Sequence, residues 1–167
     1  MKRLPLFASL FLAMIPFLSG APLNVGSPAP VASARTETGA ELNLGDVYGK
    51  SPYTLVYFYP KADTPGCTKQ GCSLRDAYAE LTTKGVTIIG VSTDDVAGQK
   101  AFKEKYNLPF TLLADTDKKV MKAFGQNGIL FASRQAYLIH DGTIVYADHK
   151  GSTTQQADDI LAFLSKL

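Results

Sequence analysis

A short apolar run leads directly into a proline and then into the only two cysteines of the chain. Residues 54–59 form a short apolar stretch, with one valine and three aromatic side chains, and are closed by Pro60, a pattern that predicts a buried β-strand. Thr64 can cap a helix and Pro65 suits its first position, so we expect a helix to begin there. The chain is therefore expected to contain a strand–loop–helix unit whose first helical turn carries Cys67.

Cys67 falls at the third position of this predicted helix. The first backbone N–H groups of a helix have no partner within it, and the helix dipole stabilises negative charge there. A thiolate is therefore favoured at this position, and the thiolate is the nucleophilic form of cysteine. The position predicts that Cys67 is a reactive nucleophile.

Cys72 lies five residues further along the same predicted helix. A helix rises about 1.5 Å per residue, which separates the two Cα atoms by roughly 8 Å. A disulfide needs Cα atoms within about 7 Å, so a Cys67–Cys72 bridge requires the helix to unwind. Gly71 should make unwinding easier, because glycine within a helix costs about 0.5–1 kcal/mol relative to alanine. This geometry favours a redox switch, with a static structural disulfide as the alternative.

The spacing of these residues resembles the peroxiredoxins, and within them the peroxiredoxin Q or bacterioferritin comigratory protein branch. The signature of the family is a proline, three residues, a threonine, two residues and the peroxide-attacking cysteine. It is matched by Pro60, Thr64 and Cys67, and the branch's resolving cysteine is matched by Cys72. The resemblance extends from about residue 25 to the C-terminus.

The resemblance implies an antioxidant thiol peroxidase that reduces hydrogen peroxide and organic hydroperoxides and needs no cofactor. A sulfenic acid would form on Cys67, and Cys72 would resolve it as an intramolecular redox disulfide. A thioredoxin-like or other thiol reductant would then restore the two thiols. The resemblance also implies a thioredoxin-like fold.

Three further residues receive candidate roles from the resemblance. The Thr64 hydroxyl would hydrogen-bond the thiolate or the peroxide, although helix capping alone is the alternative. Pro60 would end the strand and shield Cys67 from water. Arg134 matches the family's arginine before a late strand and would contact both sulfur and peroxide oxygen. A solvated arginine at a strand start is the alternative for Arg134.

Strands and helices alternate along the rest of the chain, and this order independently predicts an α/β sandwich, a central mixed sheet flanked by helices. Strands are expected at 39–44, 54–59, 86–91 and 110–113, with a hairpin of 135–139 and 143–147 around an Asp-Gly turn. The first expected helix begins at Thr64 and has an inward stripe of Leu74, Ala77, Tyr78 and Leu81. A second is expected from Thr93 or Asp94 to about Tyr106, and a third at 118–124. The last is expected to begin at Ser152 or Thr153, with Leu167 on its inner face.

The N-terminus has the layout of a secretory signal: Lys2 and Arg3, an apolar stretch at 4–18, and small residues up to Ala21. We expect a signal peptide at 1–21, a peroxiredoxin domain at 22–167, and export to the periplasm of a bacterium. The alternative is an uncleaved N-terminal anchor, although the stretch is short for a span of roughly 20 residues. Without that anchor we expect no stable membrane association, and we expect a monomer.

Charge and residue spacing argue against several other classes of protein. Removal of Lys2 and Arg3 leaves 15 basic side chains against 15 acidic ones, so no nucleic-acid partner is expected. His140 and His149 lie nine residues apart and the cysteine spacing is wider than in zinc pairs, so no metal is expected. An exported thiol–disulfide oxidoreductase remains the alternative function, although such proteins usually carry C-x-x-C after a tryptophan. A copper-delivery protein of the same fold would need a closer cysteine pair.

Overall fold

The computed structural model describes residues 21–167, so the expected signal peptide at 1–21 lies outside the described residues except for Ala21. Seven strands form one sheet in the order β2-β1-β5-β4-β3-β6-β7. The pairs β3–β4 and β4–β5 are parallel and the others are antiparallel, so the predicted mixed sheet is confirmed. The strands are β1 (Ser33–Thr36), β2 (Glu41–Asn43), β3 (Tyr53–Phe58), β4 (Val86–Ser92), β5 (Thr111–Ala114), β6 (Gln135–His140) and β7 (Thr143–Asp148).

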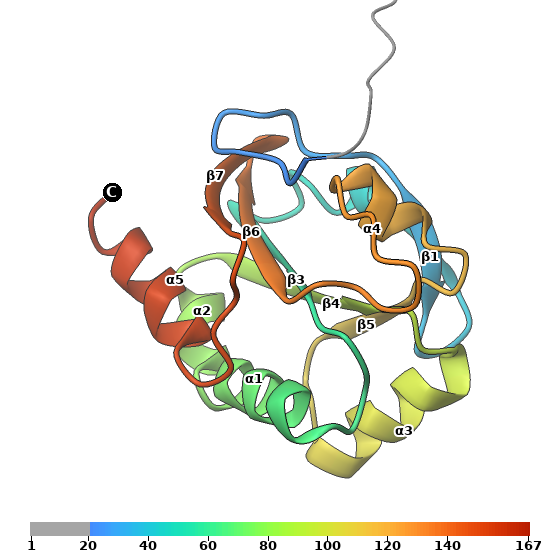
Figure 1. Cartoon of the computed structure of the whole chain (residues 1–167). Coiled ribbons are helices and arrows are strands. Elements are labelled where there is room, and N and C mark those ends of the chain that lie inside the picture. Colours follow the sequence, from blue (N-terminus) through green and yellow to red (C-terminus); the bar gives the residue numbers. More distant parts are fainter. Residues whose placement is uncertain (1–20) are drawn as a thin grey trace, which may run out of the picture.

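Helices cover both faces of this sheet (Figure 1). They are the 3-10 helix η1 (Leu44–Asp46) and the α-helices α1 (Pro65–Asp76), α2 (Tyr78–Thr83), α3 (Val96–Tyr106), α4 (Lys119–Ala123) and α5 (Gln156–Leu164). One apolar cluster joins the sheet to α1, α2, α3 and α5, and a second cluster joins the opposite face to η1 and α4. In the described part of the chain, residues 21–167, no helix combines the length and apolar character that a membrane span requires.

The central strand β3 contributes to both apolar clusters. Its side chains alternate between the faces, so Leu55 and Tyr57 pack toward α1 while Val56 and Phe58 pack toward α4. All four are fully buried. The loop after β3 therefore leaves the end of a central strand and leads into α1.

The sequence predicts a single helix across the stripe from Leu74 to Leu81, and this prediction is wrong at Ala77. The backbone of Ala77, with φ −92° and ψ 5°, leaves the helical region and separates α1 from α2. The stripe nevertheless faces the core: Leu74 and Leu81 are fully buried, and Ala77 and Tyr78 pack against the same cluster. The centroid of the Tyr78 ring lies 6.3 Å from the centroid of the Phe110 ring.

The start of α3 also differs from its prediction. Asp95 caps the helix by accepting a hydrogen bond from the Gly98 N–H, whereas Thr93 or Asp94 was the expected cap. Asp94 does not cap the helix because its carboxylate accepts from the Ala62 N–H, 2.8 Å away in the loop after β3. The displaced cap thus marks a residue that serves a tertiary contact.

The last helix, α5, begins at Gln156 rather than at the predicted Ser152 or Thr153. The Ser152 hydroxyl accepts from the backbone N–H of Gln155, 2.9 Å away, in a turn that precedes the helix. Leu167, expected on the inner face, is 75% exposed because α5 ends three residues earlier. The predicted hairpin of β6 and β7 is confirmed, with its Asp-Gly turn in the left-handed region of the backbone.

Candidate active site

Cys67 occupies the third position of α1, as predicted, and its side chain is only 1% exposed. It belongs to the apolar cluster that contains Tyr57 and Tyr59 of the central strand region. Burial raises the pKa of Tyr57 well above its usual value, so this neighbouring phenol stays neutral and puts no negative charge beside the sulfur. Cys67 is a free thiol in this structure, as is the half-buried Cys72.

Arg134 lies in the segment before β6 and reaches Cys67. Its Nη2 donates to the Cys67 Sγ over 3.5 Å, which is the contact with sulfur that the family resemblance implied. Two glycines make room for it: a Cβ on Gly66 would lie 3.1 Å from Nη2, and one on Gly151 would lie 2.8 Å from the Arg134 Cγ. The positive charge and the unpaired N–H groups of the first helical turn act together on a thiolate at Cys67.

Sequence reasoning missed two glutamines: one bonds this arginine, and the second bonds the first. Arg134 Nη1 donates to the Gln70 Oε1, and the Gln70 Nε2 donates to the Gln156 Oε1 over 2.9 Å. Gln70 lies three residues after Cys67, and this i,i+3 spacing on one helix face is the signal that could have found it. Gln156 begins α5, 86 residues away, and no local pattern in the sequence points to it.

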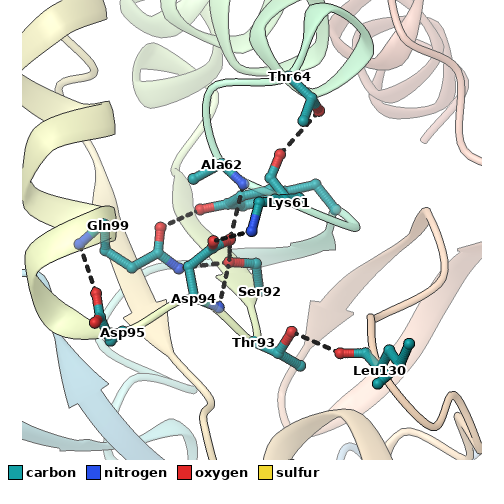
Figure 2. Close-up of polar contacts among 11 residues, drawn as sticks. Lys61, Ala62, Thr64, Ser92, Thr93, Asp94, Asp95, Gln99 and Leu130 are labelled. Atoms are coloured by element: carbon teal, nitrogen blue, oxygen red, sulfur yellow. Dashed lines mark hydrogen bonds and ion pairs between the residues drawn. The ribbon is translucent and has the colours of Figure 1, made fainter.

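Thr64 stands at the N-cap position of α1, as predicted, but its side chain makes no capping hydrogen bond. Its hydroxyl instead donates to the Lys61 carbonyl over 2.9 Å and closes the loop that follows β3 (Figure 2). Pro60 is half-buried, two residues beyond the end of β3 at Phe58, so the strand ends one residue earlier than predicted. The hydroxyl of Thr64 keeps its acceptor capacity, because a hydroxyl that donates one bond can still accept.

The loop between β3 and α1 is held from below by Asp94 (Figure 2). One carboxylate oxygen accepts from the Ala62 N–H over 2.8 Å and from the Ser92 hydroxyl over 2.7 Å. The other oxygen lies 3.9 Å from the Lys61 Nζ. The loop that carries the proline and threonine of the signature is therefore fixed to the end of β4.

A second tether joins this loop to α3. Asp63, which adopts a left-handed conformation with φ 56°, pairs with the Lys105 Nζ at 2.7 Å and accepts from the Tyr106 hydroxyl. The hydrogen bond from Lys105, followed by that from Tyr106, lowers the pKa of Asp63. The contacts of Asp94 with Ala62 and of Asp63 with α3 therefore fix the loop at two places before α1 begins.

Cys72 has a cationic neighbour of its own. The Arg75 guanidinium bonds Asp76 and donates to the Tyr106 carbonyl over 2.9 Å. The bond to Asp76 is the main cause that raises the pKa of Arg75, and Cys72 contributes as a further hydrogen-bond and charge partner. A thiolate at Cys72 would therefore have a guanidinium beside it.

The two histidines lie in unrelated surroundings. His140 Nδ1 is 2.8 Å from the Pro52 carbonyl, and His149 Nε2 is 2.8 Å from the Leu23 carbonyl. Within residues 21–167, no group of three or more His, Cys, Asp or Glu side chains could hold a metal ion.

Comparison with known proteins points in the same direction. The model of the AhpC/TSA family matches residues 25–147. A Coxiella burnetii protein named as a bcp peroxiredoxin is 47% identical over 103 residues, covering 62% of this chain and 67% of the relative. The chloroplastic peroxiredoxin Q of Suaeda salsa is 38% identical over 152 residues, covering 88% of this chain and 70% of the relative. The crystal structure of peroxidoxin BcpB from Mycobacterium tuberculosis superposes with a TM-score of 0.80 at 27% identity, covering 86% and 97% of the two chains.

A thioredoxin-like sheet with a thiol at the start of α1 defines an oxidoreductase that works through cysteine. The chain belongs to the AhpC/TSA family, as a peroxiredoxin of the peroxiredoxin Q or bcp branch. It is an antioxidant thiol peroxidase, of a class whose members act on peroxides with thioredoxin-like reductants. This result favours the peroxidase over the thiol–disulfide oxidoreductase that the sequence left as the alternative.

Proposed function

We propose that Cys67 is the peroxidatic cysteine of this peroxidase and Cys72 its resolving cysteine, with hydrogen peroxide and organic hydroperoxides as substrates. The observation that carries the proposal is the contact between the Arg134 Nη2 and the Cys67 Sγ, 3.5 Å apart at the start of α1. Of the two thiols, only Cys67 has both a guanidinium and the first turn of a helix to stabilise its anion.

In the first step the Cys67 thiolate attacks one peroxide oxygen and the O–O bond breaks. The sulfur is oxidised to a sulfenic acid, and the other oxygen leaves with a proton as water or an alcohol. Arg134 stabilises the thiolate and the negative charge that develops on the departing oxygen. The Thr64 hydroxyl, which donates its proton to the Lys61 carbonyl, accepts a hydrogen bond from the bound hydroperoxide, and Pro60 limits the approach of water along the loop.

In the second step the Cys72 thiolate attacks the sulfenic sulfur of Cys67. The S–S bond forms, the S–O bond breaks, and the hydroxide leaves as water after taking a proton. Because an intact helix keeps the two Cα atoms roughly 8 Å apart, α1 has to open for this step. A thioredoxin-like dithiol then reduces the disulfide by exchange, which oxidises the reductant and restores both thiols.

We further propose that the protein acts as a monomer outside the cytoplasm, in the periplasm of a bacterium, after removal of residues 1–21. The support is the arrangement of Lys2, Arg3 and the apolar stretch at 4–18, together with the peroxiredoxin domain at 22–167. With the N-terminal segment removed, we expect no stable membrane association. Mass spectrometry of the protein from its native cell should find an N-terminus close to Pro22, and an intact Met1 on cytoplasmic protein would contradict export.

Single-turnover kinetics of two serine variants test the division of labour between the thiols. Cys67→Ser should abolish peroxide consumption, because it removes the attacking sulfur. Cys72→Ser should consume one equivalent at the wild-type rate and stop at a sulfenic acid that dimedone traps. Loss of the first turnover in Cys72→Ser, or its survival in Cys67→Ser, would show that the roles are wrongly assigned.

A further inference from the structure

A chain of buried hydrogen bonds connects the start of α5 to the sulfur of Cys67. Gln156 and Gln70 are both fully buried, and the Gln70 Nε2 donates to the Gln156 Oε1 over 2.9 Å. The Gln70 Oε1 accepts from the Arg134 Nη1, and the Arg134 Nη2 donates to the Cys67 Sγ. The helices α1 and α5 lie side by side, so this chain crosses their interface directly (Figure 1).

The orientation of the Gln70 amide decides whether the arginine is held. An amide presents an oxygen acceptor at one side and an NH₂ donor at the other. If the Gln70 amide turned over, its NH₂ would face the Arg134 Nη1, and two donors would meet in a buried space, which is unfavourable. The acceptor oxygen of Gln156 opposes that turn, because it binds the Gln70 Nε2 and leaves the Gln70 oxygen for the arginine.

The same bond also ties down the segment of α1 that has to open. Gln70 lies between the two cysteines, so residues 67–72 cannot unwind while its amide stays docked on Gln156. A second bond in the same interface, from the Ser73 hydroxyl to the Thr154 carbonyl over 3.1 Å, lies just beyond Cys72. The start of α5 therefore contacts α1 where the disulfide would form.

We propose that Gln156 is a positioning residue that acts on both steps of the reaction, in opposite directions. It speeds the attack on peroxide by fixing Gln70, and through it Arg134, against the Cys67 sulfur. It slows resolution by holding α1 closed, and so sets the lifetime of the sulfenic acid. This proposal rests on the function proposed above, in which Cys67 reacts first and Cys72 resolves.

Opposite effects on the two rate constants are what this role requires, but a general loosening of α1 would also speed resolution. Recovery in a variant that restores the acceptor oxygen, and the lack of effect of a matched neighbour, separate the role of Gln156 from general damage to the fold. The informative variant is Gln156→Met, which keeps the length and the buried volume of the side chain but removes the acceptor. Gln156→Glu is the conservative rescue, since it keeps an oxygen facing the Gln70 Nε2. Gln155→Met is the matched control, because Gln155 is an exposed neighbour.

The experiment uses the full chain, mixed rapidly with hydrogen peroxide, quenched with a thiol-alkylating reagent and read by mass spectrometry. Gln156→Met should lower the second-order rate constant for Cys67 oxidation on the order of tenfold, the value of about one hydrogen bond. It should raise the first-order rate constant for disulfide formation several-fold. Gln156→Glu should recover most of the peroxide step, and Gln155→Met should change neither constant.

Two rate constants that stay unchanged, or that fall together, in Gln156→Met would overturn the proposal. If Gln156→Met does not fold, Gln156→Asn replaces it, because it withdraws the acceptor by one methylene and keeps a polar group; the same opposite shifts are then required. Failure of the proposed function would look different: Cys67 of the wild-type chain would not be oxidised first. Each result thus tells the two proposals apart.

Discussion

At the scale of single residues, the site depends on how one arginine is oriented. Arg134 uses one guanidinium nitrogen for the Cys67 sulfur and another for Gln70, so its plane is fixed toward the place where peroxide would bind. Its stem passes close to Gly151, where a Cβ would lie 2.8 Å from the Arg134 Cγ. The geometry thus fits a guanidinium fork that can hold sulfur and oxygen together, which a lysine cannot reproduce.

Replacement of this arginine tests that role. Arg134→Met should slow the reaction of Cys67 with hydrogen peroxide on the order of 10²-fold or more, because the developing oxyanion and the thiolate lose their cationic partner. The rate constant of Arg134→Lys should lie between those of the wild type and Arg134→Met, because lysine keeps the positive charge but not the forked guanidinium. The check is the second-order rate constant from competition with a reference peroxidase. An unchanged constant in Arg134→Met would exclude Arg134 from the reaction.

At the scale of elements, the proposed reaction gives α1 two tasks that conflict. Closed, it places Cys67 in its first turn beside the arginine; open, it lets Cys72 reach the same sulfur. Gly71 lies where the helix must open, and a Cβ there would be 3.5 Å from both the Leu108 Cδ1 and the Phe102 Cζ, which is ordinary van der Waals contact. An alanine therefore fits in the closed state without displacing its neighbours.

Gly71→Ala should favour the closed helix by about 0.5–1 kcal/mol, because alanine has the higher helix propensity. Disulfide formation should then slow about two- to five-fold, while the peroxide step stays at the wild-type rate. A longer-lived sulfenic acid should also be over-oxidised to sulfinic acid at lower peroxide concentrations. Rapid-quench mass spectrometry measures both, and an equal or faster rate of disulfide formation would contradict the helix-opening step.

Hydrogen exchange reads the opening of α1 directly. Amides of residues 67–72 should exchange much faster in the disulfide form than in the dithiol form, because the bridged segment cannot keep its helical hydrogen bonds. Amides of β3 should stay protected in both forms, since that strand lies in the centre of the sheet. Equal protection of 67–72 in the two redox states would rule out local unwinding.

At the scale of the whole molecule, the sheet fixes the distances that the site needs, and long-range polar contacts hold it together. Glu37, just after β1, pairs with the Lys103 Nζ of α3 at 2.8 Å and accepts from the Leu112 N–H of β5 over 3.0 Å. Burial alone would raise its pKa, but the bonds from Lys103 and Leu112 outweigh it and leave the pKa of Glu37 below its usual value of 4.5.

Glu37→Gln should therefore destabilise the protein by about 1–3 kcal/mol at neutral pH, where the wild-type carboxylate is charged and paired. The contribution is fully present above the unfolded-state pKa, and it is lost as the pH falls through the lower folded-state pKa. Urea unfolding at several pH values should show the wild-type and variant stabilities converging as the pH falls through the lowered folded-state pKa of Glu37. A difference that stays constant down to strong acid would show that the charge does not matter.

Local signals in the sequence were enough to predict the β3–loop–α1 unit, because each acts within a few residues. One valine and several aromatic side chains mark the strand, Pro60 follows its end, and Thr64 and Pro65 start the helix. What the sequence could not show depends on distant partners. The Thr64 hydroxyl donates to the Lys61 carbonyl instead of capping the helix. The helix break at Ala77 does not interrupt the apolar stripe, so the periodicity of the sequence gave no sign of the break.

The candidate site was likewise predictable where local signals or family motifs point to a residue, and not where a distant partner decides the contact. Family spacing identified Cys67 and Arg134, and the structure places them in contact. The Gln70–Gln156 bond joins residues 86 apart in the chain, and only the packing of α5 on α1 brings them together. Polar side chains in a core are hard to predict for this reason: what satisfies them is decided by the whole fold.

The central claim is that two thiols on one helix are oxidised in sequence and end as one intramolecular disulfide. The most direct measurement is non-reducing peptide mapping of the purified, reduced protein after one equivalent of hydrogen peroxide. A monomeric chain that has lost two hydrogen atoms, with Cys67 and Cys72 joined in one peptide, is the predicted result. A wild-type product that stays at sulfenic acid, or a disulfide between two chains, would contradict it.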